Sequence, residues 1–566
     1  MTLSLALTEL VNQAVDAAGF AGRPVPPVVP TNNPDHGDYQ SNMALRLGRS
    51  VDEKVAAAES IVANLPDNDL VASCEVVKPG FINFRLSTEG LARTLKEAVS
   101  SESFGVPQSD RTLVIDFSSP NIAKRMHVGH LRSTIIGDAI HRLYEACGWT
   151  VIADNHLGDW GTQFGKLIVA WGLWRDDAAY EADAIAELQR IYQQFGREAE
   201  TDATLLDRAR EETAKLQAGD PENIALWEQF VAASMAEFDA IYDRLDVRFD
   251  VTLGESAYRH ELQELIDELL ESGVAEVSDG AVVIPFTKKD GKGLGKSPLL
   301  IRKSDGAALY GTTDLATIRH RKNTWNPDRV VYVVDTRQQL HFRQVFASAR
   351  KMGFELHYEH VWFGMLKFPG GAVASTRAGA TANLADVLDE AVRRARLVVE
   401  EKDHGKLTGS QKADIAEKIG IGVVKYFDLR QNPQSDITFD WDASLAQNGD
   451  TAVYLMYAHA RCRSILRRSH ADHDLGDLNL VHPKERELAL ALCRLSEVVY
   501  ESAETYRPNM VAGQLYQIAN TFGGFYRECQ VIGTPEESSR LGLVLATATA
   551  LKFGLSLLGI DAPDRM

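Results

Sequence analysis

The stretch "NIAKRMHVGHLRST", residues 121–134, carries two histidines three positions apart, His127 and His130, on either side of Gly129. It follows the strand-like run "RTLVIDFSS" and opens the helix-like run "HVGHLRSTIIGDAIHRLYEACG". Free N–H groups and the helix dipole favour an anion at such a junction, and imidazole can donate hydrogen bonds to phosphate oxygens as charge develops. Gly129 has no Cβ, so a flat ring can approach its backbone closely. The pattern therefore predicts a site for nucleotide phosphates.

Two other interpretations of the histidine pair compete with this one. The pair could make only structural hydrogen bonds at the end of the helix, as an arbitrary H-x-x-H most often does. A zinc site is less favoured, because helical zinc pairs prefer a spacing of four residues and no third ligand is evident. The position between a strand and a helix is what favours phosphate.

The elements that must position the histidines form a βαβ unit. A strand-like run, the helix and a second strand-like run, "TVIADNHLG", follow one another, and Gly148 stands where the helix should end. This order predicts a parallel sheet with Rossmann-like winding in a multidomain α/β protein. Residues 1–108 predict an α+β domain, 109–440 the sheet domain with acidic helices inserted at about 173–250, and 441–566 an all-α domain.

Composition excludes several classes of protein. The chain has 566 residues, with no apolar run near the roughly 18 residues of a membrane span, and its N-terminus has the spacing of an amphipathic helix with an acidic residue, unlike a signal peptide. The five cysteines include no C-x-x-C pair, which predicts buried thiols in a cytosolic protein. A net charge of −19 argues against a nucleic-acid partner. A local basic face can still coexist with an acidic body, so RNA binding stays open.

The segment around the histidines resembles a known family. His127-Val128-Gly129-His130 is similar to the H-I-G-H signature of class I aminoacyl-tRNA synthetases, and "VIDFSSPNIAKRMHVGHLRSTIIGDA" with "NHLGDWGTQFG" resembles arginyl-tRNA synthetases of the bacterial type. The likeness continues through "LYGTTDLATIRHR", "FDLRQNPQSDITFDWD" and "YLMYAHARCRSILRR", and it includes "KPGFINF" near the start and "LLGIDAPDRM" at the end. Nearly the whole chain is covered.

This resemblance implies an arginine–tRNA ligase. Such an enzyme joins arginine to AMP from ATP and then transfers it to the terminal ribose of tRNA(Arg). The implied partners are tRNA(Arg), L-arginine and ATP with Mg²⁺, and there is no tightly bound cofactor. The family implies a cytoplasmic monomer without membrane contact. The sequence shows no dedicated protein ligands for a metal.

The resemblance also implies which residues bind arginine. Asp116 or its neighbours would hold the α-ammonium group, and Tyr310, Asp314 and Gln338 would receive the guanidinium end. A carboxylate such as Asp314 accepts a guanidinium in a two-pronged hydrogen bond that a lysine ammonium cannot reproduce. The alternative for Asp314 is a helix N-cap, because "TTDLATIRHR" begins a helix. The full arginine-binding set expected is Asp116, Ser118, Asn121, Tyr310, Asp314 and Gln338.

The phosphate-binding residues depart from the class pattern in one place. Class I enzymes usually carry a second signature, K-M-S-K-S, but the corresponding stretch here is "GGAVASTRAGATANL" and has no lysine. Many arginyl enzymes share this loss, and a lysine before the first signature replaces it; Lys124 has that position. The resemblance implies that His127, His130 and Lys124 are catalytic, and that Gly129, Ser375 and Arg377 also contact ATP. The missing lysines suggest a site that is completed only when tRNA docks.

The predicted RNA-binding residues lie in the two outer domains. In "YAHARCRSILRRSH", a helix would gather the charges of Arg461 and Arg468 on one side, and the family places an anticodon-binding domain here. In the first domain, which resembles a module that meets the tRNA elbow, Phe81 and Asn83 are candidates for stacking on and hydrogen-bonding a base. For Arg461 and Arg468, the competing interpretation is a basic stripe that faces only solvent.

Two other functions remain open from the sequence. A small-molecule nucleotidylyltransferase also uses H-x-G-H on a Rossmann-like fold, but it would not need the outer domains. A relative that binds tRNA without charging it would explain the missing lysines of the second signature. The presence of both histidines, Lys124 and Asp314 argues against this second alternative.

Overall fold

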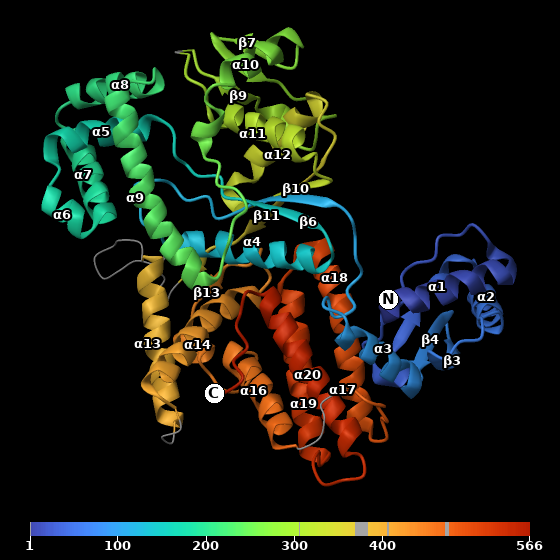
Figure 1. Cartoon of the computed structure of the whole chain (residues 1–566). Helices are drawn as coiled ribbons and strands as arrows, with labels where there is room; N and C mark the ends of the chain where they lie inside the picture. The colour runs from blue at the N-terminus through green and yellow to red at the C-terminus, as the bar shows by residue number, and fades with distance from the viewer. Residues whose placement is uncertain (1, 305, 368–382, 404–406, 470–474) are drawn as a thin grey trace.

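The computed structural model describes residues 2–304, 306–367, 383–403, 407–469 and 475–566. Figure 1 shows an α/β body with the N-terminal domain on one side, the helices α5–α9 on the other, and a bundle of C-terminal helices below. The expected fold class, a multidomain α/β protein with helical additions, is confirmed. The domain limits at residues 108 and 440 stay predictions.

A four-stranded parallel sheet lies at the centre, in the order β11-β10-β5-β6. Its strands are β5 (Thr112–Asp116), β6 (Thr150–Asp154), β10 (Arg329–Asp335) and β11 (His357–Phe363). Helix α4 (Val128–Ala146) connects β5 to β6, and the positive φ of 76° at Gly148 follows its end. The βαβ unit predicted from the sequence is therefore confirmed.

Helix α4 lies between the sheet and the C-terminal helices (Figure 1). Two buried cations attach it to α14 (Gly409–Leu429). Arg132 of α4 makes a two-pronged pair with Asp428, with N–O distances of 2.8 and 3.0 Å. Lys425 of α14 lies 3.9 Å from Asp138 of α4, and it also donates to the carbonyls of Leu245 and, at 2.8 Å, Gly559. Because buried charges require their partners, these contacts fix the helix that begins with the histidines.

The inserted segment is helical, as the sequence predicts. It consists of α5 (Thr162–Trp174), α6 (Asp177–Ala182), α7 (Ala184–Glu198), α8 (Thr204–Gln217) and α9 (Pro221–Leu245). Helix α5, which begins before the predicted limit of about 173, packs against α7 and α8. The limits of the insertion at about 173–250 stay predictions.

The second half of the sheet domain covers the other face of the sheet. It contains η4 (Glu255–Tyr258), α10 (Leu262–Glu271), η5 (Leu294–Lys296), α11 (Tyr310–Trp325), η6 (Thr336–Gln338) and α12 (Gln339–Lys351). A separate antiparallel sheet has β8 in its centre: β7 (Glu276–Ser278), β8 (Ala281–Ile284) and β9 (Leu299–Arg302). The domain closes with β12 (Leu366–Lys367), α13 (Leu384–Lys402) and β13 (Ile437–Thr438).

The N-terminal domain is an antiparallel sheet with helices, as expected. Its elements are α1 (Leu3–Val15), η1 (Asp16–Phe20), β1 (Val29–Pro30), η2 (Pro34–His36), β2 (Tyr39–Ser41), η3 (Met43–Arg46), α2 (Val51–Ala63), β3 (Val71–Val77), β4 (Phe81–Leu86) and α3 (Thr88–Ser100). Asp38 binds Arg486 of the C-terminal bundle through both oxygens, at 3.0 and 2.6 Å. This pair attaches the module to the bundle.

The C-terminal part is helical, as predicted. It contains α15 (Trp441–Ser444), α16 (Ala452–Arg468), α17 (Pro483–Cys493), α18 (Leu495–Thr505), α19 (Asn509–Glu528) and α20 (Glu537–Leu557). Helix α20 is long and apolar enough to cross a membrane by composition, but 67% of its apolar window is buried within the protein. It is the core helix of the bundle.

Candidate active site

The two histidines cap helix α4 and each other's backbone. His127 is the N-cap residue, and its Nδ1 accepts a hydrogen bond from the N–H of Gly129 at 3.0 Å. His130 Nδ1 accepts from the N–H of His127 at 3.1 Å, and the rings stack with centroids 4.0 Å apart. The structural hydrogen bonds considered from the sequence are therefore present. Because each Nδ1 is an acceptor, a neutral ring carries its proton on Nε2 and can donate from that atom.

Both rings are held in the neutral form. Burial, and then the nearby His127 and Lys124, lower the pKa of His130 to about 3. The pKa of His127 is also lowered, by burial first and by Lys124 and Arg337 as well. The pair therefore offers hydrogen-bond donors without positive charge, and the charge at this site comes from the exposed Lys124. Its Nζ lies 5.8 Å from the ring centroid of Tyr192 on α7.

Gly129 has a structural role within the protein, and its predicted contact with ATP stays a prediction. A Cβ built on Gly129 would lie 2.6 Å from Cε1 of His127, which is closer than atoms approach. The flat ring that the missing side chain admits is thus the ring of His127. Glycine is required here so that the first histidine can fold back over the helix end.

Two of the residues expected to bind the α-ammonium group have partners within the protein. Asp116, at the end of β5, pairs with the buried Arg321 at 2.6 Å, and Asp154 of β6 pairs with the same guanidinium at 2.7 Å. Ser118 Oγ lies 2.8 Å from the hydroxyl of Tyr242. Asn121 is exposed. The ammonium role of these residues stays a prediction. The contacts show that Asp116 is bound to Arg321 and that Ser118 is bound to Tyr242.

The residues expected at the guanidinium end meet near the start of α11. Tyr310 is its first residue and is 68% exposed, and Asp314 follows one turn later. Asp314 Oδ2 lies 2.5 Å from Nε2 of His341, which belongs to α12. Since the N-cap of α11 is Leu309, the interpretation of Asp314 as an N-cap is wrong. Gln338 is exposed and lies immediately before α12.

A second acidic residue, which the sequence did not indicate, completes this group. Burial, followed by the charges of Asp314 and Asp159, raises the pKa of Glu255 to about 8. Burial and then Glu255 raise the pKa of Tyr310 in turn. Glu255, Asp314 and Tyr310 therefore lie close enough to interact, since η4 packs against α11. Two carboxyl groups beside a phenol are suited to a guanidinium, and we call these three residues the acidic pocket. The surrounding sequence "LGESAY" has no periodicity or motif that would identify Glu255.

The phosphate and guanidinium ends of the site are neighbours. Arg337 is adjacent in sequence to Gln338, and its charge contributes to the lowered pKa of His127. The remaining predicted ATP contacts, Ser375 and Arg377, lie outside the described residues. The site therefore combines the neutral histidine donors and the cations Lys124 and Arg337 with the carboxyl groups of Asp314 and Glu255.

Comparison with known families accounts for all three parts of the chain. Residues 94–441 match the family described as "tRNA synthetases class I (R), catalytic domain". Residues 5–86 match "Arginyl tRNA synthetase N terminal domain", and residues 455–566 match "DALR anticodon binding domain". The chain belongs to the arginyl-tRNA synthetase family. The resemblance seen in its sequence is thereby confirmed.

Individual arginyl-tRNA synthetases align over nearly the full length. An arginine–tRNA ligase of Fusobacterium nucleatum is 42% identical, with 96% of each chain covered, and one of Pseudomonas fluorescens is 39% identical, with 99% of this chain and 98% of the other covered. The crystal structure of the Plasmodium falciparum arginyl-tRNA synthetase superposes with a TM-score of 0.86 at 26% identity, covering 100% of this chain and 99% of that one. The Thermus thermophilus enzyme gives 0.84 at 26% identity, with both chains fully covered.

The anticodon-binding part of this arginyl-tRNA synthetase family member carries an exposed aromatic and cationic cluster. The Arg461 guanidinium lies 4.6 Å from the ring centroid of Tyr457 and 5.3 Å from that of Tyr526. The two tyrosines are 46% and 41% exposed. Such a cluster can stack on bases. Arg468 is exposed at the end of the same helix, and the sequence did not identify the tyrosines.

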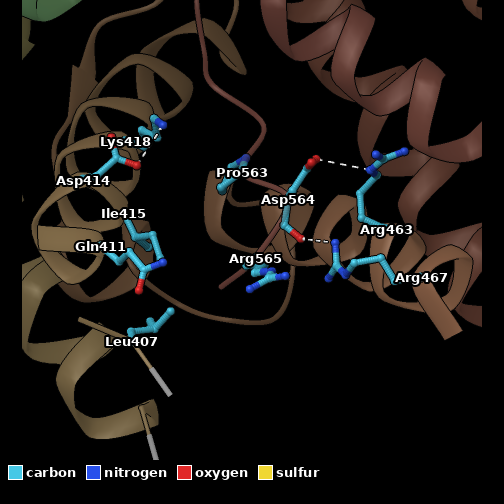
Figure 2. A pocket seen from close by; sticks show the side chains of 10 residues that line it. All are labelled: Leu407, Gln411, Asp414, Ile415, Lys418, Arg463, Arg467, Pro563, Asp564 and Arg565. Atoms are coloured by element: carbon cyan, nitrogen blue, oxygen red, sulfur yellow. Dashed lines mark hydrogen bonds and ion pairs between the residues drawn. The ribbon is translucent and has the colours of Figure 1, made fainter. Parts of the chain in front are cut away.

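The other two arginines of α16 have a different use. Arg463 Nε lies 3.3 Å from Oδ1 of Asp564, and Arg467 donates to the Asp564 carbonyl at 3.1 Å. Figure 2 shows these two contacts of Asp564. Pro563, Asp564 and Arg565 form part of the lining of a cavity of about 340 Å³ that α14 and α16 also line. The arginines of α16 therefore have two kinds of partner: Arg461 contacts exposed tyrosines, whereas Arg463 and Arg467 bind Asp564 near the C-terminus.

The N-terminal candidates lie side by side on β4. Phe81 is half-buried at the beginning of the strand, whereas Asn83 is 3% exposed. Asn83 Oδ1 accepts from Nε2 of Gln40 at 2.7 Å, and its Nδ2 has no hydrogen-bond partner among the described residues. The amide is held in place by Gln40, a neighbour that the sequence did not indicate.

Proposed function

We propose that the histidine pair and the acidic pocket together carry out the reaction of an arginine–tRNA ligase. As a member of its family, the chain activates arginine with ATP and charges tRNA(Arg) for protein synthesis. In the first step a carboxylate oxygen of arginine bonds to the α-phosphorus of ATP, and diphosphate leaves. In the second, a hydroxyl of the terminal ribose attacks the carbonyl carbon of the adenylate, and AMP leaves.

The histidines stabilise the first step. Negative charge increases on the phosphate oxygens as the α-phosphorus is attacked, and Nε2–H donors fixed in advance stabilise it without reorganisation. His127 and His130 meet this requirement, because their Nδ1 atoms are fixed to the backbone. Lys124 supplies the positive charge that the altered second signature lacks. Magnesium arrives with ATP, held by phosphate and water oxygens.

The acidic pocket selects arginine. Asp314 and Glu255 accept the guanidinium with Tyr310 beside them, while Gln338 contributes from the start of α12. A guanidinium can satisfy two carboxylates at once through its planar set of donors. A lysine ammonium would leave part of the pocket unpaired, and an unpaired buried polar group is costly.

The observation that carries this function is the packing of η4 against α11, which brings Glu255 to Asp314, in a chain whose two histidines are fixed at the start of α4 by their Nδ1 atoms. The test is arginine affinity in Asp314→Asn, measured by equilibrium dialysis, together with ATP affinity. Loss of a charged partner in a buried pocket weakens arginine binding by about 3 kcal/mol or more, roughly 150-fold, and leaves ATP unchanged. The exposed Asp267→Asn on α10 is the matched control and retains both affinities.

The catalytic part of the proposal has its own test. Incubating the protein with ATP, labelled arginine and total tRNA should give labelled tRNA, and labelled lysine should give none. A relative that binds RNA without charging it would bind tRNA and yield no product. A small-molecule nucleotidylyltransferase would remain active without residues 441–566.

We further propose that the enzyme works as a monomer in the cytoplasm, without contact with membranes. Its family and its role in translation support this setting. Light scattering on the purified chain at micromolar concentration should give the mass of one copy, 62.4 kDa. A mass of two copies would contradict it.

A further inference from the structure

The connection between β8 and β9 is a basic loop in an acidic protein. We call residues 286–298 the lysine loop. It contains one acidic residue and four lysines, Lys288, Lys289, Lys292 and Lys296, whereas the whole chain has 79 acidic and 60 basic residues. The loop therefore has a net charge of +3, whereas the whole chain has a net charge of −19.

The four lysines of the loop point to a ligand outside the protein. All four are exposed, and none of their ammonium groups has a hydrogen bond or ion pair with a residue that the structure describes. The acidic residue of the loop, Asp290, is occupied: it accepts from the N–H of Thr287 at 2.6 Å and lies 3.6 Å from Lys351. The positive charge of the loop is therefore uncompensated.

The loop is fixed to the helix that forms one wall of the arginine pocket. Two side chains of α12 donate to its backbone carbonyls, Arg343 to Lys292 and Gln344 to Ser297 at 2.9 Å, and Lys351 of the same helix donates to the carbonyl of Pro285, just before the loop, at 2.8 Å. These bonds use the carbonyls of the connection and leave its lysine side chains free. The same helix carries His341, the partner of Asp314.

The C-terminal end of the loop is connected to α11, the other helix beside the arginine pocket. It continues into β9, and the N–H of Leu309 donates to the Ile301 carbonyl of that strand at 3.0 Å, just before α11 begins at Tyr310. The lysine loop is thus joined to both helices that hold the guanidinium pocket. The terminal ribose of tRNA must reach the carbonyl group of an arginine whose guanidinium lies between these two helices.

We infer that the lysine loop binds the phosphate backbone of the amino-acid-accepting end of tRNA(Arg). The inference rests on the proposed function, because that function requires the terminal ribose to reach the adenylate. Lysines bind phosphates as point charges without reading bases, and each contact releases counterions. The contribution of the loop is therefore independent of sequence and sensitive to salt.

The test replaces the four lysines together, in Lys288→Ala/Lys289→Ala/Lys292→Ala/Lys296→Ala. Three RNAs are titrated without ATP or arginine: tRNA(Arg), a duplex of its acceptor and T stems with the CCA end, and its anticodon stem-loop. Binding of the first two should weaken about tenfold or more, and the slope of log K against log salt should fall by about 0.7–0.9 per lost contact. Binding of the anticodon stem-loop should not change.

A matched control removes the same charge elsewhere. Arg197, Arg208, Arg210 and Lys215 are exposed cations of α7 and α8, and replacing all four with alanine should leave the binding of the acceptor duplex unchanged. An equal loss in this control would attribute the effect to net charge and overturn the inference. Unchanged binding of the duplex to the loop variant would overturn it as well.

Two further measurements separate this inference from the proposed function. The affinity of the loop variant for arginine should equal that of the wild type, and its loss would show that the lysines only support the pocket. If the quadruple variant unfolds, the two double variants, Lys288→Ala/Lys289→Ala and Lys292→Ala/Lys296→Ala, should each give about half the change in salt slope. Failure of the wild type to charge tRNA would refute the function, whereas the RNA titrations would still test the loop.

Discussion

Arginine binding should release a proton from Glu255. Its pKa of about 8 in the free protein, caused by burial and then by Asp314 and Asp159, means that the carboxyl group is mostly protonated at pH 7. A guanidinium between Glu255 and Asp314 stabilises the charged form and returns the pKa to the usual range for a glutamate. The proton must therefore leave when arginine binds.

The size and sign of the pH effect follow from this pKa. Below the free pKa, binding must first remove a proton, so affinity falls as pH falls. With a free pKa of about 8 and a bound pKa near 4, roughly 0.9 proton is released at pH 7, and affinity falls about 50-fold from pH 8 to pH 6. Affinity levels off above pH 8, where Glu255 is already ionised.

Calorimetry can measure this release directly. Arginine is titrated at pH 7 in two buffers of different ionisation enthalpy, and the difference in observed enthalpy gives the number of protons released. Glu255→Gln should remove most of the release and flatten the pH profile, with weaker binding at pH 8. The pH profile of ATP binding serves as the control. Absence of proton release in the wild type, or full release in Glu255→Gln, would refute the reasoning.

Three other predictions concern the first step and the fold. His130→Ala should slow adenylate formation by about 2.7–4 kcal/mol of barrier, measured by single-turnover kinetics, with unchanged affinity for tRNA. Exchange of labelled diphosphate into ATP should be weak without tRNA(Arg) and rise strongly with it, and Lys124→Ala should abolish it in both cases; strong exchange without RNA would contradict this coupling. Arg132→Met leaves Asp428 buried without its guanidinium and should lower the free energy of unfolding by about 3–5 kcal/mol in urea, whereas adding Asp428→Leu should restore much of the loss.

The sequence alone determined what depends on local spacing. Strand, helix and strand in succession predicted the parallel sheet, and the two histidines at the start of a helix predicted donors placed for phosphate. The sheet and the place of the histidines at the start of α4 are confirmed, because a helix N-terminus and a βαβ crossover are built from neighbouring residues, whose geometry the backbone fixes. The phosphate role of the histidines stays a prediction. The long motifs around the histidines were also sufficient to identify the family.

Only the tertiary structure decided which distant groups meet. Glu255 joins Asp314 because η4 and α11 pack together, and no feature of its own segment indicates that contact. The neutral state of His130 depends on burial, which comes from the elements packed around α4. Asp116 was expected to face the substrate, but Arg321 of α11 reaches its carboxylate. Burial and long-range ion pairing depend on topology, so residue type and spacing do not determine them.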